Sequence, residues 1–145
     1  MKPVISEDFH RYCSLNNEIS ECYHNASTRL GLSDSIMQIL YVISLEGDGC
    51  LIRDIIRYTG LSKQTVNSAL RAMERDGYLQ LAAADGKKKT AILTESGKEL
   101  AENTAKKMIR AEVAVFDAWA PEDRSAYLEL TKRFLSDLEV QFHKL

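Results

Sequence analysis

Residues 51–79 contain two short amphipathic segments separated by three residues, Thr59, Gly60 and Leu61, and this spacing restricts the fold more than any other feature. The first segment, 51–58, has a helical apolar pattern. The second follows Ser62, a residue type that favours the N-cap position of a helix. Two helices joined by a three-residue turn containing glycine are typical of a helix-turn-helix. The sequence therefore predicts one in the middle of the chain.

The residues on either side extend this unit. Before it, Ser33 can cap a helix whose core face repeats at helical spacing, and the stretch "EGDG" at 46–49 ends that helix. After Gly77, the stretch "YLQLAAADGKKKTAIL" contains two short extended runs around Asp85-Gly86, a dipeptide suited to a hairpin turn. Helix, turn, helix and hairpin together predict a winged helix over residues 33–94.

Long helices are expected at both ends of the chain. Between 6 and 30, apolar residues recur every three or four positions. From Thr94 the helical spacing continues to Trp119, and Pro121 then opens a last helix with Glu122 and Asp123 near its positive end. These apolar stripes exceed the needs of one small core, so we expect residues 1–32 and 95–145 to form a dimerisation region. The predicted fold class is mainly α, a winged helix-turn-helix lobe with terminal helices, in one continuous domain.

Composition restricts the class of protein. Apolar residues make up 45% of the 145 residues and charged residues 28%, as in soluble globular proteins. The sequence contains no apolar stretch of membrane-spanning length, and its start lacks the apolar core of a secretory signal. Three cysteines without CxxC spacing suggest neither a disulfide framework nor a zinc site. We therefore expect a cytoplasmic protein in a reducing environment.

Charge is distributed unevenly along the chain. Residues 51–93 hold eight basic and four acidic residues, a net charge of +4, whereas the rest of the chain carries −6. A basic middle within an acidic chain is typical of a surface that binds a polyanion.

The helix after Ser62 shows where that surface lies. Val66, Ala69, Leu70 and Met73 share one face and must point inward. The opposite side is cationic and amide-rich, which suits a DNA major groove, where arginine pairs with guanine and glutamine or asparagine with adenine. The helix start can also bind a phosphate. The predicted DNA-binding residues on this helix are Ser62, Lys63, Gln64, Thr65, Asn67, Ser68, Arg71 and Arg75, with Arg75 nearer the DNA backbone. The alternative is a merely solvated helix face.

Three consecutive lysines follow the predicted hairpin turn. Lys87, Lys88 and Lys89 could reach phosphates or a neighbouring groove; alternatively, they form a solvated loop.

Three stretches resemble the MarR family of winged-helix regulators in order and spacing. They are "LGLSDSIMQILYVI", "IRDIIRYTGLSKQTVNSALRAMERDGYL" and "TAILTESGKEL", and with them the resemblance covers nearly the whole chain. It implies a homodimer with interlocked terminal helices and two DNA-binding lobes on a pseudo-palindromic operator. It also places residues 64–71 on the recognition helix and Lys87 to Lys89 on the wing.

The chain departs from the family at the wing. Where the family usually has an Asp followed two residues later by Arg, this sequence has Asp85-Gly86-Lys87. Lysine is more strongly hydrated than arginine and suits a narrow minor groove less well. We therefore expect this wing to make mainly phosphate contacts.

The resemblance also implies control by a small-molecule effector or an oxidant where the dimer helices meet the lobes. Tyr12, Tyr23, Tyr41 and Trp119 are the candidate pocket residues, although aromatic residues at helical spacing also suit a plain core. Cys13 resembles in placement a sensing thiol of the family, although a small buried hydrophobe is its other reading.

The sequence gives no support for catalysis, a metal site or a cofactor. His10, His24 and His143 lack ligand spacing, and nucleophile, base and phosphate-loop motifs are missing. We therefore predict a dimeric, sequence-specific regulator that binds double-stranded DNA, in keeping with a repressor released by an effector. Alternatives are a winged-helix scaffold that binds protein instead of DNA, and a redox-sensing regulator acting through Cys13.

Overall fold

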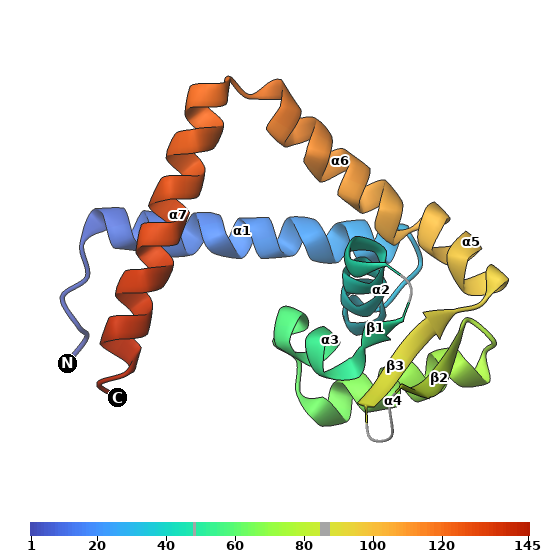
Figure 1. Ribbon diagram of the computed structural model, residues 1–145. Coiled ribbons are helices and arrows are strands. Elements are labelled where there is room, and N and C mark those ends of the chain that lie inside the picture. The colour runs from blue at the N-terminus through green and yellow to red at the C-terminus, as the bar shows by residue number, and fades with distance from the viewer. Residues whose placement is uncertain (48, 85–87) are drawn as a thin grey trace. The chain divides into compact units, whose positions relative to one another are not determined.

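The computed structural model describes residues 1–47, 49–84 and 88–145, and it forms two compact units, 1–108 and 109–145. The predicted fold class is confirmed, because a mainly helical chain carries a small antiparallel sheet in a winged-helix arrangement (Figure 1). The predicted division into a lobe of 33–94 and a dimerisation region of 1–32 and 95–145 concerns an assembly of two chains, and it stays a prediction.

The elements of the described residues follow the predicted order, apart from one additional short strand and the division of one predicted helix into two. They are α1 (Glu7–Arg29), α2 (Asp34–Glu46), β1 (Cys50–Leu51), α3 (Ile52–Thr59), α4 (Lys63–Arg75), β2 (Leu79–Ala84), β3 (Lys88–Leu93), α5 (Glu95–Asn103), α6 (Ala105–Ala118) and α7 (Pro121–Phe142). None of the helices among these residues is both long and apolar enough to cross a bilayer.

Hydroxyl side chains fix the starts of four helices. Ser6, Ser33, Ser62 and Thr94 are the N-caps of α1, α2, α4 and α5, and each side-chain oxygen accepts a hydrogen bond from the backbone N–H three residues on. Each bond satisfies an N–H that the first turn of a helix leaves without a partner. The caps predicted at Ser33 and Ser62 are confirmed.

The core of the first unit lies between α2, α3, α4 and the sheet. Ile39, Leu40, Ile55 and Val66 are fully buried there. The predicted inner face of α4 is confirmed, because Val66, Ala69, Leu70 and Met73 are all buried. Buried aliphatic side chains of this size each stabilise the fold by about 1.5 to 3 kcal/mol. This packing fixes the rotation of α4 about its axis, so that the side opposite the core faces outward.

The sheet contains a strand that the sequence did not predict. Its order is β1-β3-β2, with Cys50 opposite Ala91, Leu51 opposite Thr90 and Leu79 opposite Leu93. Leu51 was predicted to start a helix, but it lies in β1 and α3 begins at Ile52. A two-residue strand exists only through its long-range pairing, which local periodicity does not reveal.

The helix predicted from Thr94 to Trp119 is interrupted at Thr104. This residue, with φ −130° and ψ −90°, ends α5, and its Oγ1 donates to the carbonyl oxygen of Leu100 at 2.6 Å. The same kind of bond to the carbonyl of the preceding turn occurs at Thr28 and Ser44 inside continuous helices, so it accompanies the break without explaining it. The prediction of one continuous helix was wrong.

The long helices expose much of their apolar surface. On α1, Phe9, Leu15 and Ile19 are about half exposed. The second unit contains the end of α6 and α7, and none of the α7 side chains is buried. At its corner the Trp119 ring packs on Phe116 and Tyr127, with centroids 5.6 and 5.5 Å away. Arg124 donates to the carbonyl oxygens of Phe116 and Trp119, at 3.0 Å each.

Candidate nucleic-acid interface

The outward side of α4 presents the polar residues that the sequence placed there. Lys63, Gln64, Thr65, Ser68, Arg71 and Arg75 are exposed, and Asn67 is half-buried. Because Val66, Ala69, Leu70 and Met73 are buried, the side of α4 opposite them faces outward. At about 100° per residue, Gln64, Ser68, Arg71 and Arg75 gather on that outward side, and the other predicted residues of α4 lie toward its flanks.

The start of α4 is suited to an anion. Ser62 Oγ accepts from the Thr65 N–H at 3.1 Å, and it lies 2.8 Å from Thr65 Oγ1, to which it donates. The first turn contains Lys63 and no acid. Unpaired N–H groups, a positive helix end and an adjacent cation all favour a phosphate.

Carboxylates near this face are few and engaged elsewhere. Among the described residues, no carboxylate lies within ion-pair distance of Arg71, whereas Arg75 Nε lies 3.6 Å from Asp76 Oδ1. Glu74, the one acid within α4, accepts a hydrogen bond from the Leu81 N–H of β2. Arg71 therefore remains available to a base edge, as arginine in a major groove requires.

The hairpin carries a further exposed cation. Lys89 lies in β3 opposite Ala83 of β2, with an exposed side chain. The backbone of Lys88 continues the same strand opposite Ala84. Lys87, the lysine that replaces the family's arginine, lies with Asp85 and Gly86 outside the described residues.

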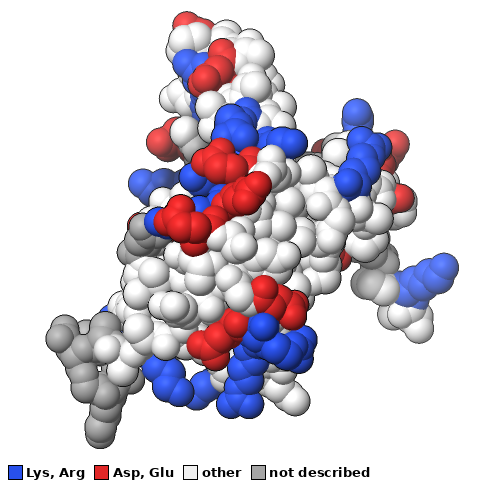
Figure 2. Space-filling view, turned by 90° about the vertical axis from the view of Figure 1, so that its right-hand side faces the viewer, with Lys and Arg blue, Asp and Glu red and all other residues white. Residues whose placement is uncertain are grey.

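Two arginines on α3 were not among the predicted site residues. Arg53 and Arg57 are exposed on the helix that precedes α4; Arg57 pairs with Asp54 at 3.4 Å and lies over the Tyr58 ring. Both arginines contribute to the excess of basic residues in 51–93, but that charge count did not identify them as binding residues. Figure 2 shows Lys and Arg side chains at the lower end of the visible face, the end at which Figure 1 places α4, with acidic side chains next to them.

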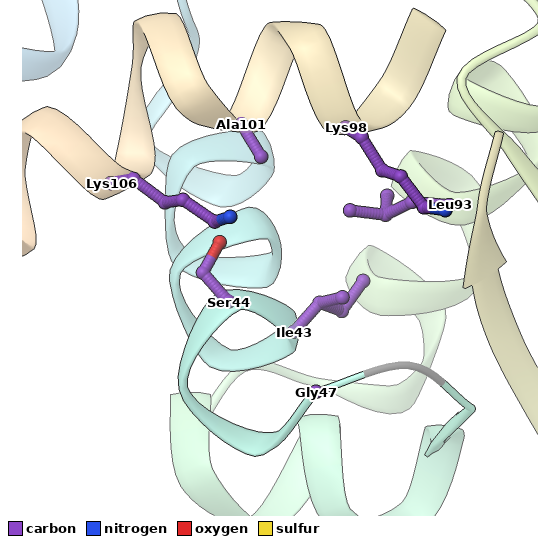
Figure 3. A pocket seen from close by; sticks show the side chains of 7 residues that line it. All are labelled: Ile43, Ser44, Gly47, Leu93, Lys98, Ala101 and Lys106. Atoms are coloured by element: carbon purple, nitrogen blue, oxygen red, sulfur yellow. The ribbon is translucent and has the colours of Figure 1, made fainter. Parts of the chain in front are cut away.

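The predicted effector residues are spread over several elements. Tyr12 and Tyr23 lie exposed on α1, Tyr41 is half-buried on α2, and Trp119 belongs to the second unit. An open cavity of about 270 Å³ lies elsewhere, between the end of α2, the end of β3 and the α5–α6 break (Figure 3). Its lining residues are Ile43, Ser44, Gly47, Leu93, Lys98, Ala101 and Lys106.

The charges of this cavity are balanced. Lys98 pairs with Glu95 at 3.1 Å and Lys106 with Glu102 at 2.6 Å, and the side chains of Ile43, Leu93 and Ala101 are apolar. Both ammonium groups already have a carboxylate, so the cavity suits an apolar molecule with a few polar atoms better than a bare anion.

The cysteines differ in environment. Cys13 is partly buried, Cys22 is exposed and Cys50 is buried in the core of the lobe. Burial raises the pKa of the Cys50 thiol, and Asp54 and Glu46 raise it further. Among the described residues, no three His, Cys, Asp or Glu side chains gather as metal ligands would.

Comparison with known proteins supports this arrangement. The model of the MarR family matches residues 30–89, which run from the end of α1 to β3. Among curated proteins, none matches the chain.

Solved structures with the same fold include several regulators. A MarR-family transcriptional regulator from Silicibacter pomeroyi has 24% identity and a TM-score of 0.68, over 85% of this chain and 86% of that one. A MarR/EmrR-family regulator from Acinetobacter sp. ADP1 has 21% identity and a TM-score of 0.74, over 93% and 99%. The Staphylococcus aureus MepR–DNA complex has 18% identity and a TM-score of 0.68, over 93% and 99%.

At these identities the structures establish the fold, and the family match covers the lobe that carries α3, α4 and the hairpin. The chain therefore has a winged helix-turn-helix fold, and its residues 30–89 are similar to the MarR family.

Proposed function

We propose that this protein is a transcriptional regulator that binds double-stranded DNA in a sequence-specific manner. The observation that supports the proposal most is the outward face of α4, which is basic and amide-rich while its single acid is engaged by β2. Gln64, Asn67, Ser68 and Arg71 then read base edges. Ser62, Lys63, Thr65, Arg75 and the lysines of the wing contact phosphates.

The same proposal includes a homodimer on a pseudo-palindromic operator. Large apolar side chains recur in exposed positions along α1 and α7, and a second copy of the chain is the simplest way to cover them. Two lobes then contact two half-sites about one helical turn apart.

We also propose repression released by a small-molecule effector. A dimer bound over a promoter obstructs transcription. A ligand that stabilises a conformation in which the two lobes cannot contact both half-sites together releases the dimer from the DNA. The cavity beside the α5–α6 break could admit such a ligand, because it contacts α2, β3 and both helices at the interruption.

The test starts from selection of bound duplexes from a random pool, followed by fluorescence anisotropy on the selected and on scrambled duplexes at several salt concentrations. Affinity should fall steeply with salt. Arg71→Ala should cost about 1 to 3 kcal/mol on the selected duplex and relax base preference, whereas Lys89→Ala should weaken both duplexes alike and reduce the salt slope by about one.

Lys107→Ala is the matched control, because it removes one exposed charge from α6 rather than from the proposed interface. It should leave the specificity ratio unchanged. Equal loss on both duplexes for Arg71→Ala contradicts its role as a base reader, and a wild type with neither base preference nor salt slope is a protein-binding scaffold instead.

A further inference from the structure

The position of Glu74 is not explained by the stability of α4. It lies in the last turn of that helix, where the negative end of the helix dipole disfavours a carboxylate. Instead, its Oε2 accepts a hydrogen bond from the backbone N–H of Leu81, with 3.0 Å between the two atoms. The Glu74 side chain therefore links the end of α4 to strand β2 of the hairpin.

Leu81 belongs to the outer strand of the sheet. In the order β1-β3-β2, strand β2 has only one neighbour, so part of its backbone faces away from the sheet. Leu81 lies opposite Ala91 of β3, yet its N–H is bound by α4. A hydrogen bond to an ionised carboxylate is shorter and stronger than one between neutral groups, so this contact can hold the strand against the helix.

The contact lies close to the exposed lysine of the wing. Ala83 follows Leu81 by two residues on the same strand and pairs with Lys89. A hairpin held at Leu81 therefore presents Lys89 at a defined place relative to Gln64 and Arg71. A hairpin free to move would have to be ordered on binding, at a cost in entropy.

We propose that Glu74 is a positioning residue that fixes the wing relative to the recognition helix α4, so that both contact DNA in one geometry. This inference rests on the proposed DNA-binding function. Glu74 itself does not contact DNA, and its carboxylate acts through the backbone of β2.

The first experiment needs no DNA. Amide hydrogen exchange at Leu81 should be at least about tenfold faster in Glu74→Ala than in wild type, since the amide loses its acceptor. Amides of Ala69 and Leu70 in α4 should keep their protection. Glu74→Gln keeps an acceptor oxygen and should restore much of the protection at Leu81.

The second experiment is a double-mutant cycle on the selected duplex. The loss of DNA affinity caused by Lys89→Ala in wild type should shrink by at least about threefold when Glu74→Ala is already present. The reason is that Lys89 contributes less to DNA binding when the hairpin is not held against α4. The same cycle with Arg71→Ala should show a smaller coupling, since Arg71 is held by α4 itself.

Asp76→Ala is the matched control. It removes the same charge two residues away, and in the structure Asp76 pairs with Arg75 rather than with β2. If Glu74→Ala merely removes a repulsive charge, it will bind DNA as Asp76→Ala does, with unchanged exchange at Leu81 and no coupling to Lys89, and the proposal falls.

If Glu74→Ala instead destabilises the whole protein, amide exchange will be faster throughout α4, and Glu74→Gln will not restore protection at Leu81. This result also overturns the proposal. If the wild-type protein does not bind DNA specifically, the proposed function is wrong. Amide exchange at Leu81 will still show whether the hydrogen bond between Glu74 and Leu81 exists in solution.

Discussion

Gly97 in α5 lies directly against the backbone carbonyl group of Tyr78, so close that a Cβ at position 97 would overlap the carbonyl oxygen. Thr94 completes the junction: its N–H donates to that same oxygen at 3.0 Å, and its Oγ1 donates to the Gly77 carbonyl at 2.6 Å. The turn that follows α4 and the start of α5 are thus packed backbone to backbone.

Gly97→Ala should therefore destabilise the protein strongly. The methyl group has no space unless α5 moves, and overpacking of this kind costs about 1 to 3 kcal/mol or more. Urea denaturation measures the loss. Ser96→Ala, at the exposed neighbouring position, should stay within about 0.5 kcal/mol of wild type. Equal stability of the two variants would show that the junction is looser in solution.

Cys50 should resist thiol reagents while Cys22 reacts readily. Cys50 is buried with a raised pKa, so at neutral pH it holds less of the reactive thiolate than an ordinary cysteine. Single-cysteine variants treated with a chromogenic disulfide should differ by at least about tenfold in rate, because a buried thiol meets the reagent only when the core opens locally. Comparable rates would mean that the core around Cys50 opens frequently.

The same pKa shift gives a direction for stability. Because the folded state favours the neutral thiol, its contribution is complete below the pKa of the unfolded chain and is lost as pH rises toward the folded pKa. Stability should therefore decline in alkaline solution more in wild type than in Cys50→Ala, as urea midpoints at rising pH can measure.

Ile19→Asp should weaken the proposed dimer. Ile19 is about half exposed on the apolar stripe of α1, and an aspartate there would bury a charge in any interface that covers the stripe. Sedimentation velocity should show wild type at about twice the 16.4 kDa chain mass and the variant shifted toward the single chain. Asn17 is exposed on the same helix, and Asn17→Asp adds the same charge, so this control variant should leave the dimer intact. A monomeric wild type would contradict the dimer itself.

The sequence predicted best what depends on local chemistry. Ser33 and Ser62 mark helix starts by their own hydrogen bonds, and the inner face of α4 follows from the spacing of Val66, Ala69 and Leu70. Features that depend on distant partners were missed. Strand β1 needs Ala91, forty-one positions from Cys50, and the interruption at Thr104 is a change of backbone conformation that helical spacing does not reveal.

The candidate site divides in the same way. Exposure of Arg71 follows from helix geometry, so periodicity could predict it. The contact of Glu74 with Leu81 joins a side chain to a strand edge seven residues on, and an acid in a helix gives no sign of such a partner. The turn at 85–87 lies outside the described residues, so the consequence of lysine at position 87 stays a prediction.

The short strand β1 has a consequence for how such a protein adapts to different operators. Because Cys50 and Leu51 pair with Ala91 and Thr90, the chain from 50 to 91 is closed at its base, with α3, α4 and β2 between the paired ends. We expect this closure to keep α3 and α4 together with the sheet, since moving them apart would break the pairing of β1 with β3. If a dimer binds half-sites at different spacings, we then expect the adjustment to arise in segments outside residues 50–91.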